Sequence, residues 1–241
     1  RVGAVAEALD ITHLMKRKPG QMSGGQQQRV ALGRALVKEP LVFLLDEPFT
    51  NLDAGLRSRM RTEVKHLHLK LGTTSVFVTH DQEEAMSLSD LIAVMRDGKV
   101  VQLGTTREIY RNPRDLYVAT FVGKPKMSLI DGSLEHSDGD VAFRSADLRI
   151  PLGSPARLGL VDGAWPSVVL GIRAEDVQVL LDGAERNADS FGATVTLLEP
   201  IGSDTFVELQ AGDAPVVARD GQKVTLSIDQ YVHATSAACR V

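Results

Sequence analysis

The chain contains 241 residues, with 27 Lys and Arg against 31 Asp and Glu, which gives a net charge of −4. It has a single cysteine, Cys239, and this excludes the internal disulfide framework of a small secreted protein. No apolar stretch comes near the roughly 18 residues that a membrane-spanning helix requires, and no signal peptide is visible. We therefore expect an intracellular chain that reaches a membrane only through partner proteins.

The first feature in chain order is a pair of glycines at a predicted helix start. Ser23, Gly24, Gly25 and Gln26 precede apolar residues at helical spacing. The first turn of a helix presents free backbone N–H groups and the positive end of the helix dipole, and glycines let an anion approach the backbone. Alone, the segment reads equally well as an ordinary N-cap turn. The spacing between this segment and the acidic residues that follow it, Asp46 and Glu47, favours an anion site.

Two adjacent carboxylates, Asp46 and Glu47, follow the apolar run 41–45. The run predicts a fully buried strand of a parallel sheet, and open α/β sheets bind ligands at the carboxyl ends of such strands. One carboxylate can hold a cation there while the other holds a proton or a water molecule. Helix capping is the alternative, but Pro48 and the loop after it place the next helix start at Asp53.

A second predicted strand, 75–78, ends at the same edge of the sheet if the crossover is right-handed. His80 follows it and can donate a hydrogen bond to a bound phosphate, although a lone loop histidine is more often without a role. Asp81 and Glu84 predict a capping box for the next helix. The other histidines lack the spacing of a metal site.

The order and spacing of these motifs resemble the ATP-binding subunit of an ABC transporter, of the sugar-importer type related to the maltose-importer ATPase. Residues 22–26 resemble the signature motif, and residues 41–47 the Walker B strand. Residues 50–53 are similar to the D-loop, and residues 79–81 to the switch histidine. Residues 171–177 are similar to a segment of that subfamily's C-terminal domain, so the resemblance covers residues 1 to about 228.

The resemblance implies an α/β fold: the C-terminal portion of a P-loop ABC ATPase domain over residues 1–124, then a small all-β, OB-like (TOBE-type) domain over 125–241. Charge supports a boundary near 123–126, because residues 1–124 carry a net +4 and residues 125–241 a net −8. Within the first part, Asp97 and Gly98 predict the turn of a hairpin between 91–95 and 100–103. In the second part the sequence predicts short strands, among them 168–172, 193–198, 205–209 and 223–228.

The resemblance also implies a mechanism that runs through a homodimer, with ATP held between the phosphate loop of one subunit and the signature of the other. It assigns ATP binding to Ser23, Gly24, Gly25, Gln26 and Asp53, the last of which would couple the two sites.

The same resemblance assigns the chemistry to three further residues. Asp46 would hold Mg²⁺ through water, Glu47 would polarise the attacking water, and His80 would contact the γ-phosphate.

Integral membrane permease subunits at the cytoplasmic face of the membrane, and indirectly an extracytoplasmic solute-binding protein, are the implied partners. An OB-like domain can bind nucleic acid, but the net −8 of residues 125–241 argues against this partner. The domain is expected to serve dimerisation and regulation. Sugar, polyol and glycerol phosphate remain open as the transported solute.

The family's phosphate loop, G-x-x-x-x-G-K-[ST], does not occur in the chain, and neither does its glutamine loop. With a start at Arg1, this indicates an N-terminally truncated chain that is inactive by itself. Two alternatives stay open. The chain can be a non-catalytic regulatory or truncated product, or it can belong to a non-transport ABC ATPase, which should carry a coiled-coil insertion or a second ATPase domain. The stretch 229–241 is assigned no function.

Overall fold

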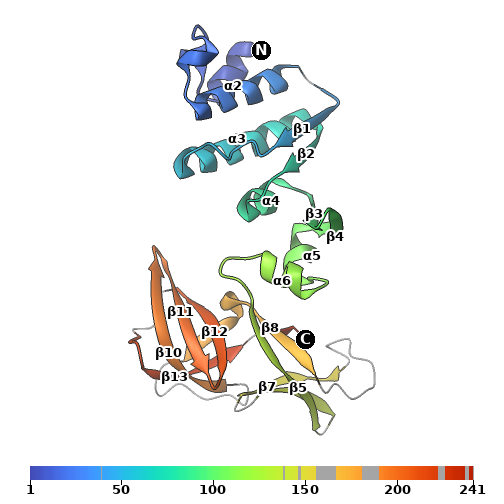
Figure 1. The fold of residues 1–241 in the computed structure, drawn as a ribbon, viewed down its shortest axis with the longest axis vertical. Helices are drawn as coiled ribbons and strands as arrows, with labels where there is room; N and C mark the ends of the chain where they lie inside the picture. Colours follow the sequence, from blue (N-terminus) through green and yellow to red (C-terminus); the bar gives the residue numbers. More distant parts are fainter. Residues whose placement is uncertain are drawn as a thin grey trace. The chain divides into compact units, whose positions relative to one another are not determined.

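The computed structural model describes residues 1–38, 40–137, 139–145, 148–155, 167–180, 190–221, 226–236 and 239–240. The chain forms two compact units, Arg1–Arg111 and Asn112–Val241 (Figure 1). The division falls before the predicted boundary at 123–126. The physical reason is a hydrogen bond within the second unit. The buried guanidinium of Arg173 donates to the carbonyl of Val122 at 2.6 Å, and Val122 directly follows the helix Leu116–Phe121, which is thereby held in that unit.

The first unit is mixed α/β. Its helices are α1 (Val2–Ala8), α2 (Gly24–Val37), α3 (Ala54–Leu71), α4 (Gln82–Leu88) and α5 (Thr106–Arg111), with short 3₁₀ turns at Thr12–Leu14 and Pro19–Gln21. Two predicted helix starts are confirmed. Ser23 forms a capping box with Gln26 at the start of α2, and Asp53 Oδ1 accepts from the Leu56 N–H at 2.9 Å at the start of α3.

Strands β1 (Val42–Asp46) and β2 (Thr74–Val78) are hydrogen-bonded as a parallel pair, with Asp46 opposite Val78. In the sequence, α3 connects them. The strands were expected there, but the expectation of full burial for 41–45 is wrong. Phe43 is 5% exposed, whereas Leu44 is 78% exposed. Side chains alternate between the faces of a strand, and only the Phe43 face packs into the core that α2 and α3 share.

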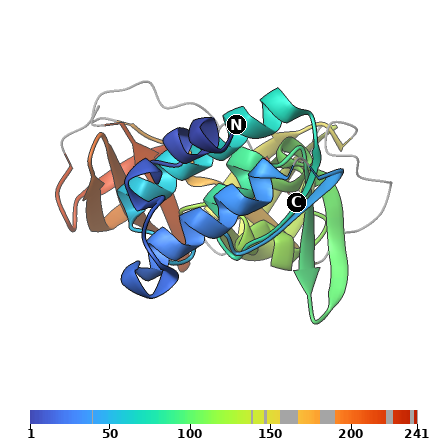
Figure 2. The same cartoon turned by 90° about the horizontal axis from the view of Figure 1, so that it is seen from above.

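Strands β3 (Leu91–Arg96) and β4 (Lys99–Thr105) form an antiparallel hairpin, seen along its length in Figure 2. Its turn has positive φ at both central residues, 51° at Asp97 and 74° at Gly98, as a type I′ turn requires. The predicted hairpin is therefore confirmed. Among the described residues no helix is long and apolar enough to cross a membrane.

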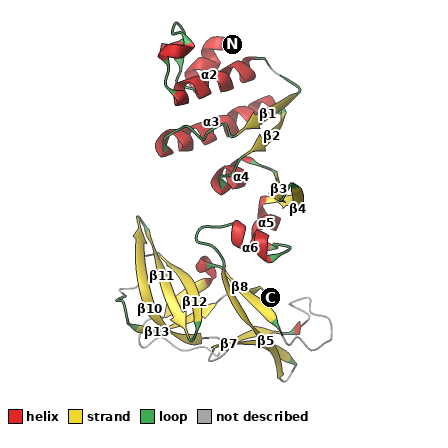
Figure 3. Cartoon of the chain, viewed as in Figure 1, coloured by secondary structure: helices red, strands yellow, loops and turns green. Residues whose placement is uncertain are grey.

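The second unit is mostly strand after the helix α6 (Leu116–Phe121) (Figure 3). In the described residues its strands form two five-stranded sheets, in the orders β12-β11-β10-β13-β9 and β14-β8-β5-β6-β7. Both sheets contribute to one hydrophobic core. The bounds are β5 (Ser128–Ser137), β6 (Asp140–Ser145), β7 (Leu148–Gly153), β8 (Val168–Ile172), β9 (Val177–Leu180), β10 (Ser190–Ile201), β11 (Asp204–Ala211), β12 (Ala214–Asp220), β13 (Tyr231–Ser236) and β14 (Cys239–Arg240), with a 3₁₀ turn at Ala174–Asp176.

Three of the four strands predicted in this unit are confirmed: β8 matches 168–172, and β10 and β11 contain 193–198 and 205–209. The fourth, 223–228, lies partly outside the described residues. Its described part, 226–228, is not a strand. The Gln230 N–H bonds to the Ser227 carbonyl at 3.2 Å, and Gln230 Oε1 accepts from the Ser227 N–H at 2.9 Å. These bonds close a turn before β13.

Candidate active site

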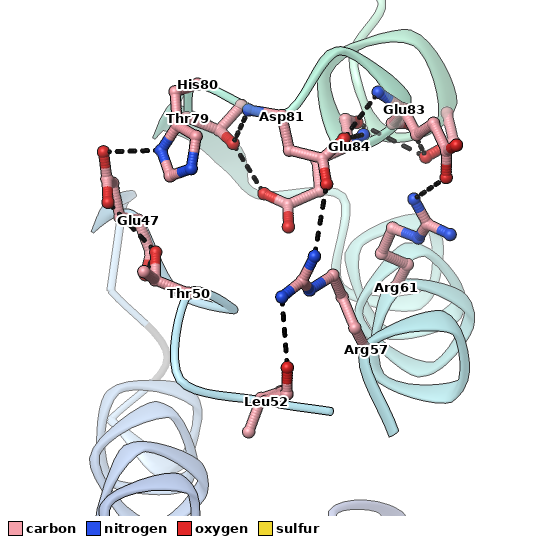
Figure 4. Close-up of polar contacts among 11 residues, drawn as sticks. Glu47, Thr50, Leu52, Arg57, Arg61, Thr79, His80, Asp81, Glu83 and Glu84 are labelled. Atoms are coloured by element: carbon pink, nitrogen blue, oxygen red, sulfur yellow. Dashed lines mark hydrogen bonds and ion pairs between the residues drawn. The ribbon is translucent and has the colours of Figure 1, made fainter. Parts of the chain in front are cut away.

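Glu47 and His80 meet at the carboxyl ends of β1 and β2. Because the strands are parallel, with Asp46 opposite Val78, the residues that follow them leave the sheet side by side. The Glu47 N–H continues the ladder by donating to the Val78 carbonyl at 2.8 Å. His80 Nδ1 then lies 2.9 Å from Glu47 Oε1 (Figure 4). The structure therefore brings together the two residues to which the sequence analysis gave catalytic roles.

The backbone of Glu47 is in an unusual conformation. Its φ is 42°, in the left-handed region that side chains other than glycine rarely adopt. Three contacts hold this turn: Gln28 Nε2 donates to the Glu47 carbonyl at 3.0 Å, and Thr50 Oγ1 donates to Glu47 Oε2 at 3.0 Å and to the carbonyl at 3.2 Å. The carboxylate therefore has a defined direction at the sheet edge.

Electrostatics favour the charged forms of both partners. The hydrogen bond from His80, followed by that from Thr50, lowers the pKa of Glu47 below its ordinary value. The hydrogen bond to Glu47, with the attraction of its charge, raises the pKa of His80. Both side chains are largely exposed, so solvent screens the pair. Within the described residues His80 Nε2 has no hydrogen-bond partner and can face a ligand.

Helix α4 begins at the turn that carries His80. Asp81 Oδ1 accepts from the backbone N–H groups of Glu83 and Glu84 at 2.8 and 3.4 Å, as an N-cap does. The predicted capping box is nevertheless only half formed. The buried Glu84 carboxylate accepts from Thr79 Oγ1 at 2.6 Å, and Thr79 Oγ1 accepts from the Asp81 N–H at 3.0 Å. The threonine hydroxyl takes the position that the Glu84 carboxylate would occupy in a complete box.

The predicted anion site, Ser23 to Gln26, forms the first turn of α2, but two of its groups are paired with each other. Ser23 Oγ accepts from the Gln26 N–H at 3.4 Å, and Gln26 Oε1 accepts from the Ser23 N–H at 3.0 Å. Gly24 is open to space. At Gly25 an added Cβ would lie 3.1 Å from the Asn51 carbonyl oxygen. The second glycine is therefore the point where α2 packs against the loop 49–53.

The two remaining predicted residues lie at element ends. Asp53 Oδ1 is engaged in capping α3. Asp46 ends β1 with an exposed side chain. Among the described residues no three His, Cys, Asp or Glu side chains gather as a metal site. A lone carboxylate at a strand end does suit Mg²⁺, which keeps several water ligands and is commonly shared with phosphate oxygens. Asp46 thus fits a water-mediated role.

Sequence reasoning missed Gln28 and Arg57. The Gln28 amide joins α2 to the next loop, since Nε2 donates to the Glu47 carbonyl and Oε1 accepts from the Asn51 N–H at 3.3 Å. Arg57 Nη2 donates to the Leu52 carbonyl at 3.1 Å, and its Nη1 lies 3.6 Å from Asp81 Oδ2. One signal was available for Gln28, which stands three residues after Gly25 and thus on the same helix face.

Comparison with known proteins identifies the family. Residues 1–50 match the family model described as ABC transporter. The chain is 49% identical to the xylose/arabinose import ATP-binding protein XacK of Haloferax volcanii, over 88% of this chain and 54% of that protein. The chain belongs to the ABC transporter ATP-binding family. The predicted resemblance to sugar-importer ATP-binding subunits of ABC transporters is confirmed, as is the fold class, an α/β unit followed by a β-rich one.

Two further relatives of this chain are also named as ATP-binding proteins of transport systems. It is 44% identical to the sulfoquinovosyl glycerol transport ATP-binding protein SmoE of Agrobacterium fabrum, over 90% of this chain and 59% of that protein. It is 40% identical to the sn-glycerol-3-phosphate import ATP-binding protein UgpC of Brucella abortus, over 100% of this chain and 64% of that protein. The chain thus spans between 54% and 64% of the length of these three relatives.

Proposed function

We propose that this chain is the signature-bearing part of an ATP-binding subunit that couples ATP hydrolysis to solute import through membrane permease subunits. The observation that carries the proposal is the contact of 2.9 Å between Glu47 and His80 at the carboxyl edge of the β1–β2 pair. The family supports ATP as the nucleotide. The names of the relatives refer to import of xylose or arabinose, transport of sulfoquinovosyl glycerol and import of sn-glycerol-3-phosphate, and they support a sugar or a related polyol or phosphate as the solute.

Glu47 is the group that orients the attacking water. A carboxylate has about four lone-pair sites, so acceptance from His80 and Thr50 leaves acceptor positions for a water proton. The water oxygen attacks the γ-phosphorus, the proton moves toward Glu47, and ADP leaves. His80, held through Nδ1, directs Nε2 as a donor to a γ-phosphate oxygen.

Mg²⁺ and the signature complete the nucleotide site. The cation, when bound, neutralises charge on the phosphates, and Asp46 would hold it through water. Ser23, Gly24, Gly25 and Gln26 would act in trans on the nucleotide of a second ATPase subunit, with the Ser23–Gln26 capping bonds opening to the phosphate. Asp53 would couple the two nucleotide sites of the homodimer.

The chain by itself is proposed to be inactive. A helix N-terminus contributes roughly 0.3 to 2 kcal/mol to binding an anion, whereas a micromolar nucleotide complex needs about 8 kcal/mol. No phosphate-loop motif occurs in the 241 residues to supply the difference. A non-catalytic regulatory product is the alternative that predicts the same inactivity.

The second domain, residues 125–241, is proposed as an OB-like (TOBE-type) module for dimerisation and regulation. The assembly would lie at the cytoplasmic face of the membrane, against integral permease subunits and, through them, an extracytoplasmic solute-binding protein. The net −8 of residues 125–241 supports a protein partner over nucleic acid.

A hybrid protein tests the proposal. This chain would replace the matching segment of the Haloferax relative, at 49% identity, so that the hybrid also contains the rest of that relative. We expect Mg²⁺-dependent phosphate release and, in the Glu47→Gln hybrid, retained ATP binding with turnover reduced by a factor of about 10² to 10⁴. A folded hybrid without turnover, or a Glu47→Gln hybrid with undiminished turnover, would contradict the proposal.

A further inference from the structure

Arg57 joins two loops of the candidate site. It lies in the first turn of α3 and is 32% exposed at its side chain. Its Nη2 donates to the Leu52 carbonyl at 3.1 Å, and its Nη1 lies 3.6 Å from Asp81 Oδ2 (Figure 4). Leu52 belongs to the loop that carries Thr50, and Asp81 is the residue after His80. One cation therefore touches the two segments whose side chains, Thr50 and His80, bond the Glu47 carboxylate.

These contacts close a ring around the site. Starting at Glu47, the ring runs through Thr50 and the 49–53 loop to Arg57, crosses to Asp81, and returns through His80 (Figure 4). Every link in the ring is a peptide connection, a hydrogen bond or an ion pair. Loss of Arg57 would remove the link between the 49–53 loop and Asp81 without deleting either side chain that bonds the Glu47 carboxylate.

We propose that Arg57 is a positioning residue that holds the 49–53 loop and the turn of His80 at a fixed separation, so that His80 meets Glu47. The inference rests on the function proposed above, because it gives a purpose to the contact between these two residues. Arg57 touches no reacting group itself and acts through the two segments.

The geometry calls for arginine. The planar guanidinium fork aims one nitrogen at a backbone carbonyl and another at a carboxylate in fixed directions. Its Nε is buried and has no hydrogen-bond partner among the residues that the structure describes. A lysine at this position retains the charge but presents a single nitrogen, which cannot reproduce two fixed directions. We therefore expect Arg57→Lys to restore only part of what Arg57→Ala removes.

Arg61 is a matched control in the same helix. One turn further along α3, its Nη1 lies 3.0 Å from Glu83 Oε2 in the first turn of α4. Arg61 thus links the same two helices by an ion pair, but this ion pair involves neither the 49–53 loop nor the turn of His80. If Arg57 merely fastened α3 to α4, Arg61→Ala should have the same effect as Arg57→Ala.

The decisive readout is the titration of His80 by NMR in the 241-residue chain, with its signal assigned by His80→Gln. The charged groups that face His80 are Glu47, Glu84 and Asp81, and the hydrogen bond that His80 donates to Glu47 is the main cause of its raised pKa. Loss of positioning in Arg57→Ala would break that bond and lower the pKa. Simple loss of a cation beside Asp81 would strengthen the negative field and raise the pKa instead.

We expect the His80 pKa to fall in Arg57→Ala, to fall less in Arg57→Lys and to stay unchanged in Arg61→Ala. An unchanged or raised pKa in Arg57→Ala, or an equal fall in Arg61→Ala, would overturn the inference. If Arg57→Ala does not fold, as judged by circular dichroism, Arg57→Lys decides alone: a lowered His80 pKa supports the role and an unchanged one overturns it.

Turnover in the hybrid separates this inference from the proposed function. We expect Arg57→Ala to reduce kcat for ATP by a factor of about 10 to 100, as small misplacements of reacting groups do, with KM unchanged within about twofold. Arg61→Ala should retain kcat. A hybrid that hydrolyses no ATP even with Arg57 present refutes the proposed function, while the His80 titration still reports on positioning. Full kcat in a folded Arg57→Ala hybrid refutes the positioning role alone.

Discussion

His80 Nδ1 lies 2.9 Å from Glu47 Oε1 because each residue follows the end of one of two adjacent parallel strands. The contact depends on two backbone registers and on several polar tethers, and each of these can be perturbed separately.

The charge state of this pair gives a pH window. The raised pKa of His80 means that its contribution to stability is complete below its ordinary value of 6.5 and is lost as the pH rises through the folded pKa. The lowered pKa of Glu47 means that its contribution is present above 4.5 and is lost as the pH falls through the folded value. The doubly charged pair is therefore maintained between these ordinary values.

NMR titration should find the His80 pKa lowered in Glu47→Gln and unaltered in Glu7→Gln, a remote control. Equal values in all three proteins would argue against the contact.

Gln28 should protect the loop that follows β1. Replacement by alanine removes the acceptor of the Asn51 N–H and the donor to the Glu47 carbonyl. We expect hydrogen exchange at the Asn51 amide to accelerate roughly fivefold, equivalent to about 1 kcal/mol for a lost hydrogen bond. The control is Gln27→Ala, since Gln27 bonds instead to the carbonyls of Pro19 and Met22. Acceleration at Asn51 in both variants would show that α2 as a whole, rather than Gln28, protects the loop.

The two glycines in the first turn of α2, Gly24 and Gly25, should differ in how substitution by alanine affects stability. A Cβ at Gly25 lies 3.1 Å from the Asn51 oxygen and 3.2 Å from Leu52 Cδ2, whereas a Cβ at Gly24 meets nothing within 4 Å. We expect Gly25→Ala to be about 1 to 2 kcal/mol less stable than Gly24→Ala, because overpacking opposes the gain in helix propensity. Thermal unfolding followed by circular dichroism at the helical band measures the difference. Equal stability would mean that the 49–53 loop adjusts to the methyl group.

In the second unit, Asp204 and Arg219 form a two-pronged pair across β11 and β12, with N–O distances of 3.0 and 2.9 Å. The hydrogen bonds from Arg219 lower the pKa of Asp204. The stabilisation is thus present above the ordinary pKa of 3.8 and is lost as the pH falls through the folded value. Arg219→Gln should raise the Asp204 pKa in a carboxyl-carbon NMR titration. A pKa that does not move would show that the arginine is not its cause.

Sequence patterns predicted those parts of the fold that local chemistry decides. The helix starts at Ser23 and Asp53 and the Asp97-Gly98 turn depend on residues close in sequence, and all three formed as expected. Burial of the strand 41–45 was not predictable in the same way, since it depends on what covers the second face of the sheet. The partner of Glu84 was missed because the nearby Thr79 hydroxyl competed for its carboxylate.

In the candidate site, too, some features could be predicted from the sequence and others depended on the tertiary structure. The meeting of Glu47 and His80 followed from two strand ends and a right-handed crossover, both of which can be read from apolar runs and their spacing. Gln28 offered only its spacing from Gly25 as a signal, and Arg57 offered none, because the partners of both include backbone groups in other loops. Every residue has a backbone carbonyl, so the amino-acid sequence does not indicate which carbonyl a side chain will bond.

The positive φ of Glu47 is unfavourable for the stability of the fold, although the same residue carries the carboxylate of the candidate site. Glycine adopts a φ of 42° without the strain that a side chain brings, so Glu47→Gly would relax the turn as it removes the carboxylate. Selection for a sturdier fold alone would therefore favour losing the glutamate. Its presence in so unfavourable a conformation agrees with the role proposed for the carboxylate, which a glycine at this position would lose.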